Sequence, residues 1–230
     1  MRTIGLIGGM SFESTAIYYR MINEMVRERL GPDHSARVLM HSVDFADIIA
    51  CQKENRWDDA AAILAHSAKS LENAGADNIL ICTNTMHLVA DQIRSATKAP
   101  LIHIIDETAA ALNEAGMKRP LLVATRYTMD HGFYHQRMAR AGLELMVPEE
   151  SDRGRVHDII FSELCRGKVE DGSRHQLMEI VERAKLAGAD SVILGCTEIC
   201  LILDPDALSL PGFDSTAIHA RAAVKHALAA

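Results

Sequence analysis

Residues 74–85 read AGADNILICTNT, and residues 187–198 repeat this stretch without a gap as AGADSVILGCTE. A shift of 113 positions (187 − 74) aligns Ala-Gly-Ala-Asp with itself, one apolar run with another, and Thr83 with Cys196. The period is half the chain, far longer than the roughly 20 to 50 residues of solenoid repeats. The repeat therefore predicts two similar halves.

Shorter similarities follow the same order along the two halves. Residues 102–109 (IHIIDETA) and 210–217 (LPGFDSTA) share Asp-x-Thr-Ala, and residues 5–11 (GLIGGMS) and 121–127 (LLVATRY) both read as a strand followed by a turn. We therefore expect an α/β protein of two pseudo-symmetric lobes, each a parallel sheet flanked by helices. The predicted first lobe is residues 1–98 with 210–230, and the second is residues 99–209.

Apolar runs typical of strands alternate with amphipathic stretches typical of helices, which is the pattern of βαβ units. The expected strands are residues 4–7, 38–42, 78–83, 101–104, 121–124, 144–147 and 191–194. The expected helices are residues 13–30, 57–73, 86–97, 132–141, 153–166, 172–186 and 216–228.

Composition restricts the class of ligand and the compartment. The 230 residues carry a net charge of −7 without a Lys/Arg cluster, which argues against a nucleic-acid partner and favours a small molecule. No apolar stretch approaches the roughly 18 residues that span a bilayer, and no secretory leader is evident, so we expect no membrane partner and a cytoplasmic protein. Five cysteines without Cys-x-x-Cys indicate reduced thiols. We also expect a homodimer.

Ligands of open parallel sheets bind beyond the carboxyl ends of the strands. Small and hydroxylic residues follow four predicted strands, at residues 8–14, 83–87, 125–128 and 196–198. One such segment can equally be a turn or a helix cap. Four together favour a site that binds a carboxylate at helix N-termini.

Cofactor motifs are absent from the sequence. Gly5-x-x-Gly8-Gly9 is not the dinucleotide motif Gly-x-Gly-x-x-Gly, and there is neither a Walker-type loop nor His-Glu-x-x-His. His87, His103 and His219 are too far apart in sequence to indicate a metal cluster, so we expect each to be a hydrogen-bonded residue that either stabilises the fold or supports the site from behind, and not a ligand. The sequence predicts no cofactor and no metal.

Cys196 stands where an apolar strand stops, directly before Thr197 and Glu198 at the start of a predicted helix. A helix N-terminus stabilises a thiolate, so we expect a lowered thiol pKa and a catalytic role. Cys82 and Thr83 cannot both face the same side of a regular strand. Because the repeat aligns Thr83 with Cys196, we expect Thr83 in the site and Cys82 in the core.

The motifs CTNTMH (residues 82–87), GCTE (residues 195–198), LIGGMS and ATRYTM resemble the aspartate/glutamate racemase family, and within it the enterobacterial racemases of L-aspartate and L-glutamate. The resemblance covers essentially the whole chain. It implies two α/β lobes with the active site between them and racemisation by two thiols, without pyridoxal phosphate or metal.

The resemblance also assigns roles to residues of this chain. Cys196 is implied as the acid/base of the second lobe, and Thr125 and Thr128 as ligands of the α-carboxylate. A loop at residues 51–56 is expected to meet the distal carboxylate, with Gln52 as first choice and Arg56 as second. The other implied substrate contacts are Met10, Ser11, Asn84, Thr85, Thr197 and Glu198.

Thr83 stands where the family usually has the other catalytic cysteine, and a hydroxyl is a far weaker acid than a thiol. The leading hypothesis is a cofactor-independent racemase of aspartate and glutamate that acts preferentially on the L-enantiomer, with Cys196 and Thr83 as catalytic residues. A decarboxylase or isomerase of a dicarboxylate is the second hypothesis. A degenerate dicarboxylate-binding protein without turnover is the third.

Overall fold

In the computed structural model, which describes residues 1–229, the two copies of the repeated stretch form equivalent strands. These are β3 (Asn78–Ile81) and β5 (Ser191–Leu194), and each follows a turn in which glycine adopts positive φ, 97° at Gly75 and 95° at Gly188. The aspartate of each copy accepts hydrogen bonds from the chain just before the neighbouring strand. Asp77 Oδ2 lies 2.6 Å from the Thr3 amide, and Asp190 Oδ2 lies 2.6 Å from the Lys118 amide.

The chain divides into two compact units. One comprises residues 1–103 and the C-terminal residues from His219, and the other comprises residues 104–218. The division differs from the predicted one because Leu101 bridges to Ile79 of β3, whereas β6 (Gly212–Asp214) pairs with β5. Backbone pairing therefore assigns residues 99–103 to the first unit and residues 210–218 to the second.

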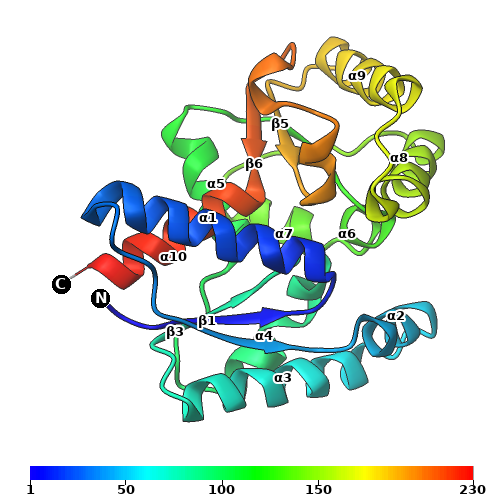
Figure 1. Ribbon diagram of the computed structural model, residues 1–230. Coiled ribbons are helices and arrows are strands. Elements are labelled where there is room, and N and C mark those ends of the chain that lie inside the picture. The colour runs from blue at the N-terminus through cyan, green and yellow to red at the C-terminus, as the bar shows by residue number, and fades with distance from the viewer. Residues whose placement is uncertain (230) are drawn as a thin grey trace. The chain divides into compact units, whose positions relative to one another are not determined.

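The sheet of the first unit is parallel, in the order β2-β1-β3, with β1 at Ile4–Gly8 and β2 at Val38–Ser42. Helices cover both of its faces (Figure 1). They are α1 (Phe12–Leu30), α2 (Phe45–Lys53), α3 (Trp57–Asn73), η1 (Thr85–Val89), α4 (Ala90–Ser95) and, from His219 onward, α10 (Ser215–Leu228).

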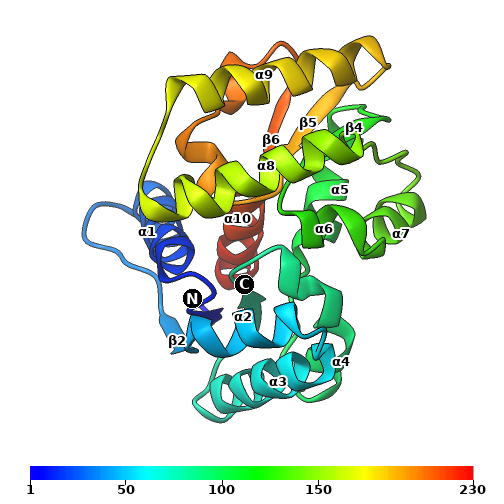
Figure 2. The same cartoon turned by 90° about the vertical axis from the view of Figure 1, so that its right-hand side faces the viewer.

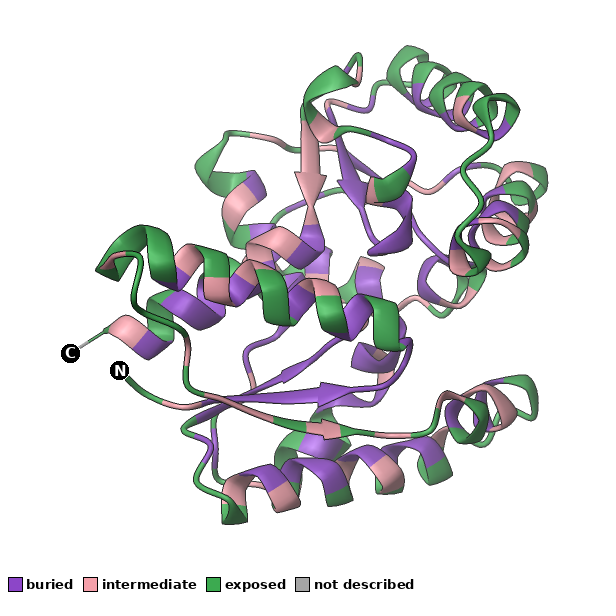
Figure 3. Cartoon of the chain, in the orientation of Figure 1, coloured by how far each residue is buried: buried purple, intermediate pink, exposed green. Residues whose placement is uncertain are grey.

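Alternate residues of the strands in the first unit pack in two different core clusters. Leu80 and Cys82 pack with Tyr18 of α1 and with residues of α10, whereas Ile79 and Ile81 pack with residues of α2 and α3. The two faces follow from the two-residue period of a strand. Figure 3 shows the resulting burial of β1, whose five residues are all buried.

The sheet of the second unit is also parallel, in the order β4-β5-β6, with β4 at Pro120–Val123. Its helices include α8 (Glu150–Ser162) and α9 (Asp171–Leu186), which lie side by side (Figures 1 and 2). The remaining elements are α5 (Ile104–Glu114), α6 (Arg126–Asp130), α7 (Phe133–Arg140), η2 (Leu164–Arg166), η3 (Glu198–Leu201) and η4 (Pro205–Ala207).

The two sheets are equivalent in topology. In the first unit, Leu101 bridges to β3 and extends the order β2-β1-β3 by a fourth position. In the second unit, Met146 bridges to Leu121 of β4 and precedes the order β4-β5-β6. Each sheet therefore has four positions, in which β1 corresponds to β4 and β3 to β5. The prediction of two pseudo-symmetric α/β units with parallel sheets is therefore confirmed. Among the described residues, no helix is both long and apolar enough to cross a membrane.

Several predicted elements are wrong in detail. Residues 101–104 and 144–147 form single bridges instead of strands, and α5 begins where the first of these strands should end. The helix predicted at residues 86–97 is divided into η1 and α4, and β3 ends at Ile81. Short apolar runs are compatible with a strand and with the first turn of a buried helix, so periodicity alone cannot separate them.

Gly9 is required by the turn after β1. Its φ is 89°, and a Cβ atom would collide with the backbone oxygen and nitrogen of Val43. We expect Gly9→Ala to lower the free energy of unfolding by about 3 kcal/mol or more, from strain and collision together. Gly75→Ala is the matched control, since its φ is 97° but no atom lies within 4 Å, and we expect a loss of about 1 kcal/mol. Urea denaturation measures both, and equal losses would contradict the collision.

Candidate functional site

The turn after β1 places Met10 and Ser11 at the start of α1. Ser11 is the N-cap of this helix, and its Oγ accepts a hydrogen bond from the Ser14 amide at 3.3 Å. Thr15 Oγ1 donates to the Ser11 carbonyl at 2.8 Å and accepts from the Gly9 amide at 2.9 Å. Met10 and Ser11 are both buried. These bonds fix the turn, so its side chains are held in place before any ligand binds.

Thr83, Asn84 and Thr85 follow β3, the neighbour of β1 in the sheet. Ser14 Oγ donates to the Cys82 carbonyl at 2.9 Å, which ties the first turn of α1 to the end of this strand. The structure thus brings the first-unit residues Met10, Ser11, Thr83, Asn84 and Thr85 to one edge of the sheet. Their assignment to substrate binding stays a prediction.

Cys82 and Thr83, the two residues that follow β3, differ in exposure. Cys82 is fully buried in the core beside Tyr18, and burial raises the pKa of its thiol far above the ordinary value. Thr83 is partly exposed. The prediction that Cys82 is a core residue is confirmed.

A group of buried histidines supports the segment after β3. His87 Nδ1 lies 2.8 Å from the Thr83 carbonyl, which only accepts, so Nδ1 is the donor. His219 Nε2 donates to the Ile102 carbonyl, and its Nδ1 accepts from the Tyr18 hydroxyl, both at 2.8 Å. Burial lowers the pKa of His219 to about 4, which keeps the ring neutral for these bonds. The hydrogen bonds expected of His87 and His219 are therefore present.

Gln52 and Arg56 have different surroundings. Gln52 is buried in the last turn of α2, and its Nε2 donates to Met86 Sδ at 3.3 Å. Arg56 is exposed and already pairs with Glu54 at 2.7 Å and with Asp59 at 2.6 Å. Residues 51–53 are helical and not part of a loop as predicted. Of the two candidates, the surroundings favour Gln52 as the residue available to a buried ligand.

Thr125 and Thr128 lie together after β4 in the second unit. Thr125 is the N-cap of α6, and its Oγ1 lies 3.1 Å from Thr128 Oγ1. Both residues are buried. The five-residue helix α6, absent from the predicted elements, is what turns the two hydroxyls toward each other.

Cys196 occupies the equivalent position after β5, the neighbour of β4. Its Sγ donates to Glu198 Oε2 at 2.9 Å, and Thr197 Oγ1 donates to the same oxygen at 2.6 Å. Thr197 and Glu198 are buried, whereas Cys196 is partly exposed. The second unit therefore brings Thr125, Thr128 and the Cys-Thr-Glu segment to one edge of its sheet.

The predicted lowering of the Cys196 pKa is wrong. Burial, followed by the charge of Glu198, raises the pKa of this thiol well above its ordinary value. The helix expected to stabilise a thiolate is the four-residue η3, and Glu198 at its first position supplies a full negative charge beside the sulfur. A nearby carboxylate outweighs the partial charge of a helix end, which is about half a unit.

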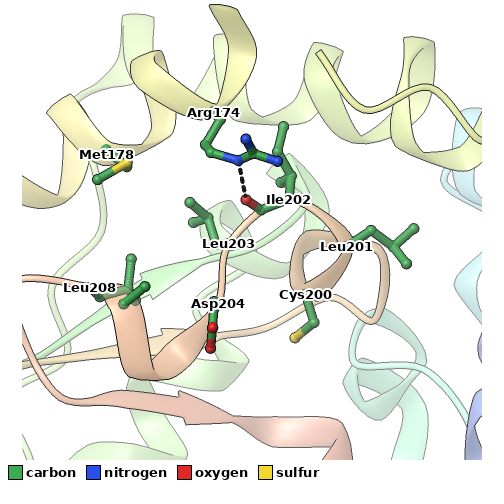
Figure 4. Close-up of a pocket in the computed structure, with 9 residues that line it drawn as sticks. Arg174, Met178, Cys200, Leu201, Ile202, Leu203, Asp204 and Leu208 are labelled. Atoms are coloured by element: carbon green, nitrogen blue, oxygen red, sulfur yellow. Dashed lines mark hydrogen bonds between the residues drawn. The ribbon is translucent and has the colours of Figure 1, made fainter. Parts of the chain in front are cut away.

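A cavity of about 270 Å³ lies on the α9 side of η3 (Figure 4). It is lined by Arg174, Met178, Cys200, Asp204 and apolar residues of η3 and η4, and by none of the predicted site residues. Arg174 Nε donates to the Ile202 carbonyl at 3.0 Å, which braces the chain after η3. The cavity is therefore separate from the candidate site, although one of its walls is the element that carries Glu198.

Both units present hydroxyl and amide groups at the carboxyl edge of a parallel sheet, and the second adds a hydrogen-bonded thiol. Such groups can bind a small carboxylate and move a proton. Among residues 1–229, no three His, Cys, Asp or Glu side chains are arranged to hold a metal ion. The fold defines a two-unit α/β protein with parallel sheets, and its candidate site contains hydroxyl, amide and thiol groups.

Residues 7–223 match the Asp/Glu/Hydantoin racemase family, and the chain belongs to that family. The activity of the chain is accordingly that of an amino-acid racemase.

Solved structures and a curated relative agree with this membership. A protein from Yersinia pestis, proposed to be an Asp/Glu racemase, is 45% identical with a TM-score of 0.94 over the whole of both chains. An aspartate racemase homologue from Pyrococcus horikoshii OT3 is 33% identical with a TM-score of 0.88 over 99% of each chain. The broad specificity amino-acid racemase RacX of Bacillus subtilis is 23% identical, over 98% of each chain.

The sequence alone did not reveal the hydrogen bond between Cys196 and Glu198. The Gly-Cys-Thr-Glu motif predicts only that Glu198 lines the substrate site. The bonds from Ser14 to Cys82 and from His87 to Thr83 were also not predicted. Of these bonds, only that between His87 and Thr83 joins residues four apart, which meet on one face of a helix, whereas Ser14 and Cys82 lie 68 positions apart in the chain.

Proposed function

We propose that this protein racemises aspartate and glutamate without pyridoxal phosphate or metal, and that it acts preferentially on the L-enantiomer. Cys196 removes the α-proton of the L-amino acid, and Thr83, alone or through water, serves the opposite face. The observation that carries this proposal is the placement of Cys196, partly exposed and hydrogen-bonded directly after a buried strand. We expect the protein to be a cytoplasmic homodimer, which light scattering and fractionation would test.

Hydroxyl and amide donors would stabilise the charge that develops when the α-proton leaves. The electron pair of the broken C–H bond moves into the α-carboxylate, which becomes enolate-like. The hydroxyl oxygens of Thr125 and Thr128 lie 3.1 Å apart in the second unit, within hydrogen-bond distance of each other, and we expect this fixed pair to contact such a group. Preorganised donors are effective because they need not reorient while charge develops.

The test is incubation of the purified protein with each enantiomer of aspartate and glutamate, without added cofactor, followed by chiral chromatography. We expect both mirror-image products. Carbon dioxide release from a dicarboxylate without inversion would instead support a decarboxylase. Calorimetric binding of a dicarboxylate without any turnover would support a binding protein.

Recognition of the distal carboxylate of the substrate gives a separate prediction for Gln52 of α2. Gln52→Leu should raise KM for aspartate and glutamate about tenfold while kcat changes less than about threefold, since a contact made equally in ground and transition states affects KM. Arg56→Ala is the matched control and should leave KM unchanged, because Glu54 and Asp59 already engage the guanidinium. Steady-state kinetics measures both variants. A larger KM effect for Arg56→Ala would reverse the assignment.

A further inference from the structure

Glu198 is a buried carboxylate held by its two preceding residues. Thr197 Oγ1 and Cys196 Sγ both donate to Oε2, at 2.6 and 2.9 Å. A buried charge is costly unless it is hydrogen-bonded, and donors to one oxygen reduce that cost. The arrangement therefore places a proton acceptor, Glu198 Oε2, next to the Cys196 thiol.

Other ionisable groups near this pair come from η2, η3 and β6. Cys165 of η2 faces Cys196, and Cys200 of η3 lies close to both Glu198 and Asp214 of β6. Glu198 hydrogen-bonds to Cys196 directly, with 2.9 Å between Cys196 Sγ and Glu198 Oε2. Proton transfer requires contact of this kind, typically about 2.6–3.2 Å between heavy atoms.

We propose that Glu198 is a positioning residue that takes the proton of the Cys196 thiol and returns it, so that the two side chains share one proton at rest. This inference rests on the proposed racemase function and deepens it. It assigns to Glu198 a role in proton transfer instead of substrate contact.

The steps balance in protons and charge. The thiol proton moves to Glu198 Oε2, giving a thiolate and a neutral carboxylic acid. The thiolate then takes the α-proton, and the electron pair of the C–H bond stays on the substrate as an enolate-like anion. When Cys196 returns a proton to the face from which it was taken, Glu198 gives its proton back to the thiolate. When Thr83, alone or through water, protonates the opposite face, Glu198 releases its proton to solvent water and Thr83 regains one from solvent water.

The surroundings explain why such a relay is needed. Burial and the Glu198 charge raise the pKa of the Cys196 thiol, so a thiolate beside an ionised carboxylate is disfavoured. Moving the proton onto the carboxylate removes that like-charge repulsion while the thiolate forms. The same carboxylate that suppresses the free thiolate thereby provides a route to it.

The first test compares Glu198→Gln with Glu198→Asp. Glutamine keeps the size and an acceptor oxygen but cannot take the proton, so kcat should fall about 100-fold while KM changes less than about threefold. Aspartate keeps the carboxylate, and we expect it to restore at least about a tenth of kcat. Glu182→Gln, on the exposed face of α9, removes one charge elsewhere and should leave kcat unchanged.

The second test needs no substrate. Alkylation of Cys196 by iodoacetamide, located by peptide mass spectrometry, reports the reactive thiolate as a function of pH. In the wild type and in Glu198→Asp, the rate should be nearly constant from about pH 6 to 8, because transfer to the carboxylate does not change the total number of protons. In Glu198→Gln it should rise about tenfold per pH unit, as expected for a simple thiol.

A kcat within about threefold of wild type in folded Glu198→Gln, or a tenfold rise per pH unit in the wild type, would overturn the relay. Should Glu198→Gln not fold, the wild-type and Glu198→Asp alkylation profiles still decide the question. Absence of racemisation in the wild type would instead contradict the proposed function, whereas the alkylation profile would be unaffected.

Discussion

Cys196→Ser is expected to lower kcat for aspartate and glutamate by about 1000-fold or more, because a serine hydroxyl is a much poorer base than a thiolate. Cys82→Ser should keep at least about a tenth of the activity, because Cys82 is enclosed in the core. Chiral chromatography of both variants at equal enzyme concentration measures the difference.

Stability must be separated from catalysis in this pair of variants. A serine at position 82 places a hydroxyl in an apolar core, which costs free energy unless it finds a partner. Cys82→Ala avoids that cost, and circular dichroism shows whether each variant is folded. Equal kinetic losses in folded Cys196→Ser and Cys82→Ala would show that the catalytic thiol is wrongly assigned.

Hydrogen at the α-carbon of L-glutamate should exchange with deuterated water about ten times faster, or more, than D-glutamate appears. The reason is the asymmetry between the two proposed acids, since a hydroxyl such as that of Thr83 protonates a carbanion at neutral pH less readily than a thiol does. Exchange on the Cys196 face requires the abstracted proton to be replaced by deuterium before return, and Glu198 offers a path for this. Proton NMR follows the exchange while chiral chromatography follows inversion.

Symmetry limits how a preference for the L-enantiomer can arise. Mirror-image amino acids in water have equal free energies, so kcat/KM must be equal in the two directions whichever residues act. A preference can therefore appear only as a higher kcat with a higher KM, or as exchange without inversion. The deuterium experiment detects the second of these directly.

Thr83→Cys supplies the second thiol that the family usually has. We expect it to bring the rate of inversion closer to the rate of exchange. Exchange no faster than inversion in the wild type would contradict the asymmetry and would show that Thr83, or a water molecule that it positions, is an effective acid.

The sequence by itself determined the two-unit architecture. Because β3 and β5 are copies of one stretch, and because side chains alternate along a strand, the repeat placed Cys82 in the core and gave Thr83 and Cys196 equivalent positions. Both conclusions depend on the repeat and on the alternation of side chains along a strand, and both of these can be read directly from the order of residues. Element boundaries were predicted less well. Ile104, for example, was expected to end a strand but is the first residue of the buried helix α5.

The tertiary structure decided the electrostatics of the candidate residues. A thiol pKa depends on which charges lie within a few ångströms, and the sequence did not show that the Glu198 carboxylate turns back onto Cys196. For the same reason, the sequence did not predict two other sets of contacts. These are the ion pairs of Arg56 with Glu54 and Asp59, and the hydrogen bond from His87 to the Thr83 carbonyl. Backbone periodicity fixes which way a strand residue faces, whereas contacts between side chains after a strand depend on how the following turn folds.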